Sequence, residues 1–212
     1  MSSYALLLPA PWRRIPLEDR TETRVEVRRY IAEASTRAPE EISRDDLAAL
    51  RIELEGRMTR QMDQLRDNGG VDFYLPTGPL HGVDLNASFV VSSVIPDASA
   101  DASWVAPVLA SLQAGGAETL TLGGAPWSRS EEVVHTDGSD LVEAGLAARK
   151  VTYTAAVPGD ERRWAIVAAT VIGDGDPDSD HTGLVVELFD AIMTTWRWDP
   201  AVRSASEETV PS

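Results

Sequence analysis

The sequence contains no cysteine and only one lysine, Lys150, among its 212 residues. The lack of cysteine excludes disulfides, thiolate nucleophiles, cysteine-bound zinc and iron–sulfur clusters, and it fits a reducing compartment. No stretch approaches the roughly 18 uninterrupted apolar residues of a membrane-spanning helix. The short apolar run at 5–10 lacks the preceding basic residues of a secretory signal. We therefore expect a cytoplasmic protein that does not bind membranes.

Acidic residues outnumber basic ones, and the formal net charge is −15. Residues 1–70 contain 12 Arg and 13 Asp or Glu, a net of −1, so residues 71–212 carry the remaining −14. The lysine and arginine clusters that neutralise phosphates are missing, which argues against nucleic-acid binding. A basic protein partner is compatible with this charge. Because like charges repel, we expect a monomer or a weak homodimer formed through the nearly neutral first 70 residues.

The spacing of apolar residues predicts two long helices before residue 70. The first spans 18–34, and the second begins at the N-cap Ser43 and ends at the Asn-Gly-Gly sequence 68–70. Six apolar side chains of the second helix form a stripe that we expect in the core: Leu47, Leu50, Leu54, Met58, Met62 and Leu65. The opposite face, which includes Arg51, is expected to be solvated. A short helix at 104–112 and a terminal helix at 182–196 follow later in the chain.

A period of two, typical of strands, begins at Val71. The expected strands span 12–17, 71–75, 85–95, 118–122, 127–135, 149–157 and 163–172. Strands joined by tight turns pair antiparallel, so we predict an α+β fold with a mainly antiparallel sheet and helices packed on both faces. We expect a single domain over 1–203, with a helical insert at about 18–67, and a disordered tail at 204–212.

Three segments of the chain follow a distinctive order. The opening LPAPWRRIPL places a proline before a tryptophan, a long hairpin VTYTAAVPGDERRWAIVAATVIG leads to an acidic turn, and the helix LVVELFDAIMTTWRW comes last. This order resembles the PsbP-like superfamily, and the chain is similar to uncharacterised actinobacterial proteins of this length. The resemblance implies an antiparallel sheet covered by helices and a non-enzymatic binding or assembly role. It implies no functional residues, because the superfamily shares none.

The segment 173–181 concentrates carboxylates between the last predicted strand and the terminal helix. Its aspartates stand at alternate positions: Asp174, Asp176, Asp178 and Asp180. Ca²⁺ prefers such oxygen ligands. An EF-hand loop beginning at Asp174 would need Gly at Ser179 and Glu at Val185, so that motif fails. These aspartates are candidate metal ligands, and a plain strand-to-helix turn capped by Asp180 is the alternative.

The sequence contains no recognisable catalytic motif. The nucleophile motifs G-x-S-x-G and S-x-x-K and the Walker sequence are all missing, and His81, His135 and His181 do not have the spacing of metal ligands. Exposed tryptophans often anchor interfaces, and three of the six are not clearly inward-facing. These three are candidate partner-binding residues: Trp12, Trp127 and Trp198.

We therefore favour a non-catalytic protein-interaction or assembly module that needs no cofactor. Its partner would be a protein, for instance a basic one bound in the manner of an immunity protein or a chaperone. Two alternatives stay open. One is a small hydrolase-type enzyme without a recognisable motif, and the other is a calcium-binding domain that uses the acidic loop at 174–180.

Overall fold

The computed structural model describes residues 4–37, 42–95, 112–113, 115–135 and 147–199. Seven strands form an antiparallel sheet in the order β2-β3-β4-β8-β7-β6-β5, and β1 pairs with β9 in a second sheet. The strands are β1 (Tyr4–Ala5), β2 (Trp12–Pro16), β3 (Gly70–Pro76), β4 (Ala87–Val94), β5 (Glu118–Leu122), β6 (Ala125–His135), β7 (Ala147–Val157), β8 (Asp160–Val171) and β9 (Arg197–Trp198). The helices are α1 (Arg20–Ser35), α2 (Arg44–Asp67) and α4 (Asp180–Thr194). None of these helices is long and apolar enough to cross a membrane.

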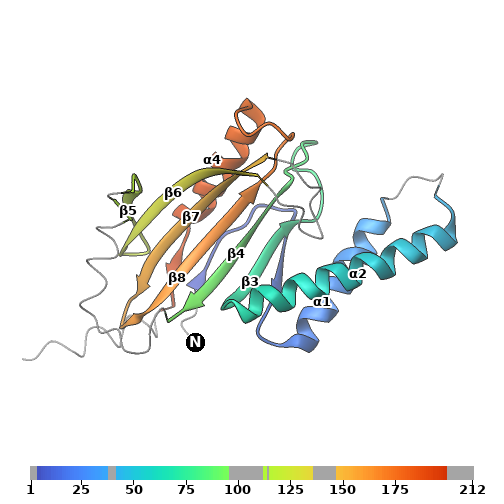
Figure 1. Cartoon of the computed structure of the whole chain (residues 1–212), viewed down its shortest axis with the longest axis horizontal. Helices are drawn as coiled ribbons and strands as arrows, with labels where there is room; N and C mark the ends of the chain where they lie inside the picture. Colours follow the sequence, from blue (N-terminus) through green and yellow to red (C-terminus); the bar gives the residue numbers. More distant parts are fainter. Residues whose placement is uncertain (1–3, 38–41, 96–111, 114, 136–146, 200–212) are drawn as a thin grey trace, which may run out of the picture.

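The helices cover both faces of the large sheet, as predicted (Figure 1). Helix α4 packs its apolar side, including Phe189 and Ile192, against β3, β4, β7 and β8 in the larger core. Helices α1 and α2 form a hairpin between β2 and β3, and residues such as Val27 and Met62 pack on the opposite face in a smaller core. The fold is therefore α+β, with an antiparallel sheet between helical layers. The predicted helix at 104–112 lies outside the described residues except for its last position. The predicted tail at 204–212 lies entirely outside them.

The helices begin at short polar side chains that accept hydrogen bonds from exposed backbone N–H groups. Ser43 is the N-cap of α2 and accepts from the Asp46 amide, which confirms the prediction. At α4 the prediction was wrong, because the N-cap is Ser179, whose Oγ accepts from the Thr182 amide at 3.1 Å. Asp180 instead occupies the first turn, where its negative charge favours the helix N-terminus.

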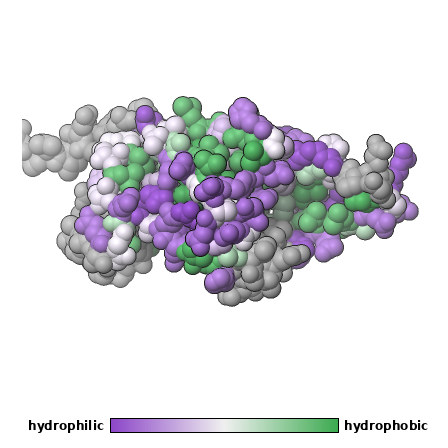
Figure 2. Space-filling model, turned by 90° about the horizontal axis from the view of Figure 1, so that it is seen from above, coloured by the Kyte–Doolittle hydropathy of each residue, from purple (hydrophilic) through white to green (hydrophobic). Residues whose placement is uncertain are grey.

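The apolar stripe of α2 is only partly in the core, contrary to the prediction. Met58 and Met62 are buried in the smaller core between the hairpin and the sheet, but Leu50 is 42% exposed. The reason is geometric: the far end of the α1–α2 hairpin extends beyond the β2 edge of the sheet, so the sheet packs closely against only part of the stripe (Figure 1). Apolar surface is visible on the projecting hairpin in Figure 2.

Strand β3 is buried on both sides rather than on alternate positions. Asp72 and Tyr74, which alternate with the apolar Val71, Phe73 and Leu75 in the sequence, are nevertheless 1% and 4% exposed. The two-residue strands β1 and β9 were not predicted, since two residues carry no periodic signal. They place Tyr4 over this face of β3, where its ring stacks on Trp196 with 4.5 Å between ring centroids.

Candidate functional site

The four candidate metal ligands of the acidic loop do not come together as a metal site. No group of three or more acidic or histidine side chains among the described residues could hold an ion. Asp174 instead accepts hydrogen bonds from Ser179 Oγ at 2.7 Å and from the Asp176 amide, and Asp176 accepts from the Asp178 amide at 3.0 Å. The bond from Ser179 is the main reason why the pKa of Asp174 is lowered. The carboxylates therefore order the turn and the start of α4.

Close packing in this loop gives a test of its structural role. Gly173 has φ +60°, and a Cβ there would lie 2.1 Å from Thr182 Oγ1, whereas a Cβ at Gly175 (φ +95°) meets nothing within 4 Å. We expect Gly175→Ala to cost about 1 kcal/mol through its left-handed backbone. Gly173→Ala should cost a further 1–3 kcal/mol or so through overpacking. Urea denaturation of both variants measures the difference, and equal losses would contradict the close contact.

Two of the three tryptophan candidates are not available as surface anchors in this structure. Trp127 and Trp198 are 0% and 2% exposed, and they stack on each other with ring centroids 5.7 Å apart. Trp12 is partly buried and packs against Phe89 in the larger core. The sequence prediction failed because tryptophan is as common in cores as in interfaces. The premise that Trp127 and Trp198 are exposed was therefore wrong, and a role of Trp12 in partner binding stays a prediction.

Two clusters of polar side chains lie on the α4 face of the sheet. Asp72 accepts from the Tyr4 hydroxyl at 2.5 Å and from Arg14 Nε at 2.6 Å. Burial raises the pKa of Tyr4, and it raises the pKa of Tyr74 beside it to about 12. These groups satisfy one another, so the cluster holds β1 to the sheet and leaves no reactive group open.

The second cluster joins α4 to β6 and β7. Arg129 donates to both oxygens of Asp190, at 3.0 and 2.9 Å, and the Tyr153 hydroxyl donates to the same carboxylate at 2.7 Å. Burial alone would lower the pKa of Arg129, but the hydrogen bonds that it donates to Asp190 and Glu131 raise it. Every member has a partner, which is the pattern of a structural brace.

A groove with a volume of about 780 Å³ lies between the α1–α2 hairpin and the sheet. One wall is the α2 stripe, the other is α1, and the floor is the sheet face opposite α4. Its lining includes Leu47, Leu50, Leu54, Met58 and Gln61 of α2, Tyr30, Ile31 and Ala34 of α1, and Phe73, Leu75, Ser88 and Thr170 of the sheet. The part of α2 that lines the groove, from Leu47 to Gln61, is about 21 Å long along the helix axis. Binding sites for small molecules have volumes of this order, and clefts between elements are common binding sites.

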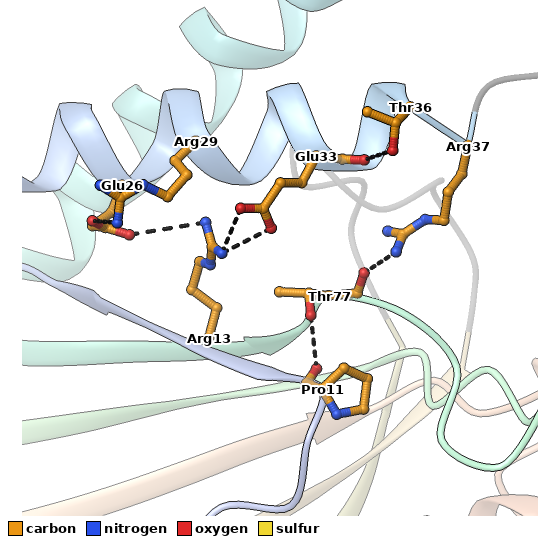
Figure 3. Close-up of polar contacts among 8 residues, drawn as sticks. All are labelled: Pro11, Arg13, Glu26, Arg29, Glu33, Thr36, Arg37 and Thr77. Atoms are coloured by element: carbon orange, nitrogen blue, oxygen red, sulfur yellow. Dashed lines mark hydrogen bonds and ion pairs between the residues drawn. The ribbon is translucent and has the colours of Figure 1, made fainter.

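Polar contacts fix the position of α1 above β2 (Figure 3). Arg13 of β2 donates to both carboxylate oxygens of Glu33 at 2.8 Å, and it lies 3.9 Å from Glu26. Arg37, just beyond α1, donates to the carbonyl oxygen of Thr77 in the loop after β3. These contacts tie the hairpin to the sheet at one end of the groove, so the groove is a formed feature of the fold.

Two polar side chains in the groove, Arg51 and Gln61, lack partners among the described residues. Arg51 has no ion pair or hydrogen bond with any described residue, although nearby Arg57 lies 3.7 Å from Glu53. The Oε1 atom of Gln61 is buried without a hydrogen-bond partner, and a buried polar atom of this kind calls for an explanation. Burial raises the pKa of Tyr30, which stays neutral at physiological pH. The groove thus combines apolar walls with unused donors and acceptors.

Sequence reasoning missed this site. It placed Arg51 on a solvated face, although Arg51 follows Leu47 by four residues and precedes Leu54 by three, which is the spacing of the apolar stripe. Gln61 likewise follows Met58 by three residues. A charged and an amide side chain inside an apolar stripe were the available signal.

Comparisons with known proteins return no match: no family model, no curated protein and no solved structure matches this chain.

Proposed function

We propose that the protein is a non-catalytic interaction module, and that the groove between the α1–α2 hairpin and the sheet receives an apolar segment of a partner protein. The observation that carries the proposal is the half-covered stripe of α2. Leu50 at 42% exposed and Ile42 at 36% line the rim of a groove whose deeper walls are also apolar. Exposed apolar surface that adjoins a groove is typical of protein-binding sites.

The lining of the groove supports binding over catalysis. The described lining contains no histidine, and its one carboxylate is Asp84. General acid–base and nucleophilic catalysis usually need a nucleophile and a base within hydrogen-bonding distance. Among the described contacts of the groove, no hydroxyl of Tyr30, Ser88 or Thr170 is hydrogen-bonded to an acid or a histidine. The resemblance to the PsbP-like superfamily, which stays a prediction, implies a binding role as well.

The net charge of −15 adds an expectation about how the partner arrives. Seen from a distance, the protein is an anion, so a partner with a basic surface is attracted before it makes contact. Electrostatic steering of this kind acts on the association rate, and salt screens it beyond about 8 Å at physiological ionic strength. We propose that the partner is basic overall.

Filling the groove is expected to abolish binding. Ser88 of β4 lies on the groove floor and is partly buried, so Ser88→Trp would occupy the space that a ligand needs. The partner would be captured from the host lysate on the wild-type chain, identified by mass spectrometry, purified and titrated against each variant. We expect Ser88→Trp to lose binding at least tenfold, and the wild-type association rate to fall as salt is raised.

The matched control is Ser130→Trp, which places the same side chain on exposed β6 outside the groove. Both variants must keep the wild-type melting behaviour for the comparison to count. Thr170→Trp, at the position of β8 paired with Ser88 and also in the lining, serves if Ser88→Trp is unstable. Equal affinity of the wild-type and the groove-filled chain would refute the groove as the binding site. An association rate that ignores salt would refute the basic partner.

A further inference from the structure

The charge inside the groove is opposite to the charge of the whole protein. Its ionisable lining groups are the guanidinium groups of Arg37 and Arg51, the carboxylate of Asp84 and the neutral phenol of Tyr30. Their sum is +1 in a chain whose net charge is −15. A bound segment therefore meets a positive local charge in the groove, whereas the partner as a whole is attracted by the negative net charge of the protein.

Both arginines of the described groove lining have N–H groups available for a ligand, and Arg51 has the most. It has no ion pair or hydrogen bond within the described chain, whereas Arg28, Arg57 and Arg66 of the same hairpin each contact a carboxylate. Arg37 has one donor committed to the Thr77 carbonyl, although a guanidinium has five N–H groups. Guanidinium groups bind carboxylates through two parallel hydrogen bonds, which gives both affinity and orientation.

Gln61 supplies the complementary feature at the deeper end of the groove. Its Oε1 is a buried acceptor without a donor, and a backbone N–H of an extended segment is a donor of the right kind. The 21 Å or so between Leu47 and Gln61 fits about six residues of extended chain at 3.3 Å per residue. An open groove of that length, with apolar walls, matches a peptide segment.

We propose that the groove binds a short peptide segment that combines apolar side chains with an aspartate or glutamate, and that Arg51 contacts this carboxylate. This inference rests on the proposed function and names the chemistry of the segment. The partner protein is basic overall, and the segment that enters the groove is locally acidic. Charge complementarity at the contact then sets specificity, while the net charge sets the rate of encounter.

The test uses a phage-displayed library of random 12-residue peptides, selected on the full-length chain. We expect the selected peptides to be enriched in apolar residues together with Asp or Glu, and to lose binding to the Ser88→Trp chain. For an individual selected peptide, Arg51→Glu should weaken the Kd about tenfold or more, and Arg51→Gln should weaken it less. The control Arg162→Glu makes the same charge change at an exposed position of β8 outside the groove. It should leave the Kd within about twofold.

The outcomes separate this inference from the proposed function. Peptides that need an open groove but show no acidic enrichment, or whose affinity ignores Arg51→Glu, would overturn the inference and leave the groove as the interaction site. Selection of Lys- and Arg-rich peptides would overturn it as well. Peptides that bind the Ser88→Trp chain unchanged would instead remove the groove from both proposals. Occupation of the groove by a second copy of the chain, detected as a dimer that Ser88→Trp dissociates, would overturn the peptide assignment.

Discussion

Replacing Asp72 with alanine is expected to lower the free energy of unfolding by about 1–3 kcal/mol. Asp72 is 1% exposed, and it accepts from the Tyr4 hydroxyl and from Arg14 Nε. Alanine removes both acceptor oxygens, so the buried Tyr4 hydroxyl keeps only its neighbour Tyr74, 2.9 Å away. It also leaves a space beneath β1. Chemical denaturation followed by circular dichroism measures the loss.

Asp84→Ala is the control for this substitution, because Asp84 is an exposed carboxylate for which no ion pair is seen among the described residues. We expect it to change stability by less than about 0.5 kcal/mol. Asp72→Asn separates shape from charge, since the amide fills the space but loses the ion pair with Arg14. If Asp72→Ala and Asp84→Ala had the same stability, the buried cluster would not hold β1 to the sheet.

Replacing Trp196 with alanine should cost more, about 3–5 kcal/mol, because it empties the centre of the aromatic cluster. Trp196 is 0% exposed and follows α4 directly. Its ring stacks on Tyr4 at 4.5 Å between centroids and meets Trp127 and Trp198 edge to face at 5.0 and 5.2 Å. The substitution therefore weakens the contacts that hold β1, β9 and β6 together.

Urea denaturation gives the size of the loss, and the slope of the transition shows whether the rest of the fold still unfolds cooperatively. The matched control is Leu184→Ala. Leu184 lies on α4 and is 64% exposed, so its loss should cost under about 1 kcal/mol. A small loss for Trp196→Ala, similar to that of Leu184→Ala, would contradict the aromatic cluster as a main source of stability.

Elements whose signals are local were predicted well from the sequence. The N-cap Ser43 and the strand Glu118–Leu122 were predicted at the observed residues. Helix α4 was predicted within two residues of its observed ends. In each case the chain itself carries the information, as a capping side chain, an alternation or an apolar period. The antiparallel pairing of β7 with β8 followed from the turn between them.

Features that depend on distant parts of the chain were not predicted. Asp72 appeared to be on a polar face because nothing in its neighbourhood indicates that β1 covers it from 68 residues away. The amphipathic pattern of α2 shows that one side is apolar, but it does not show how far the sheet extends beneath it, so Leu50 was expected to be buried. The groove could not be predicted for the same reason, since its lining comes from α1, α2 and strands as far along the chain as β8.

The unequal sizes of the two cores have a consequence for motion. The core under the α1–α2 hairpin has eight buried residues in the described chain, whereas the core under α4 has 22. Segments that bury less apolar surface open at a lower free energy than the global unfolding transition. Amide hydrogens of α1 and α2 should therefore exchange with solvent deuterium faster than those of β7 and β8. Such opening would let the hairpin lift from the sheet while the rest of the sheet stays folded, so the width of the groove becomes a dynamic property that a bound segment would restrict.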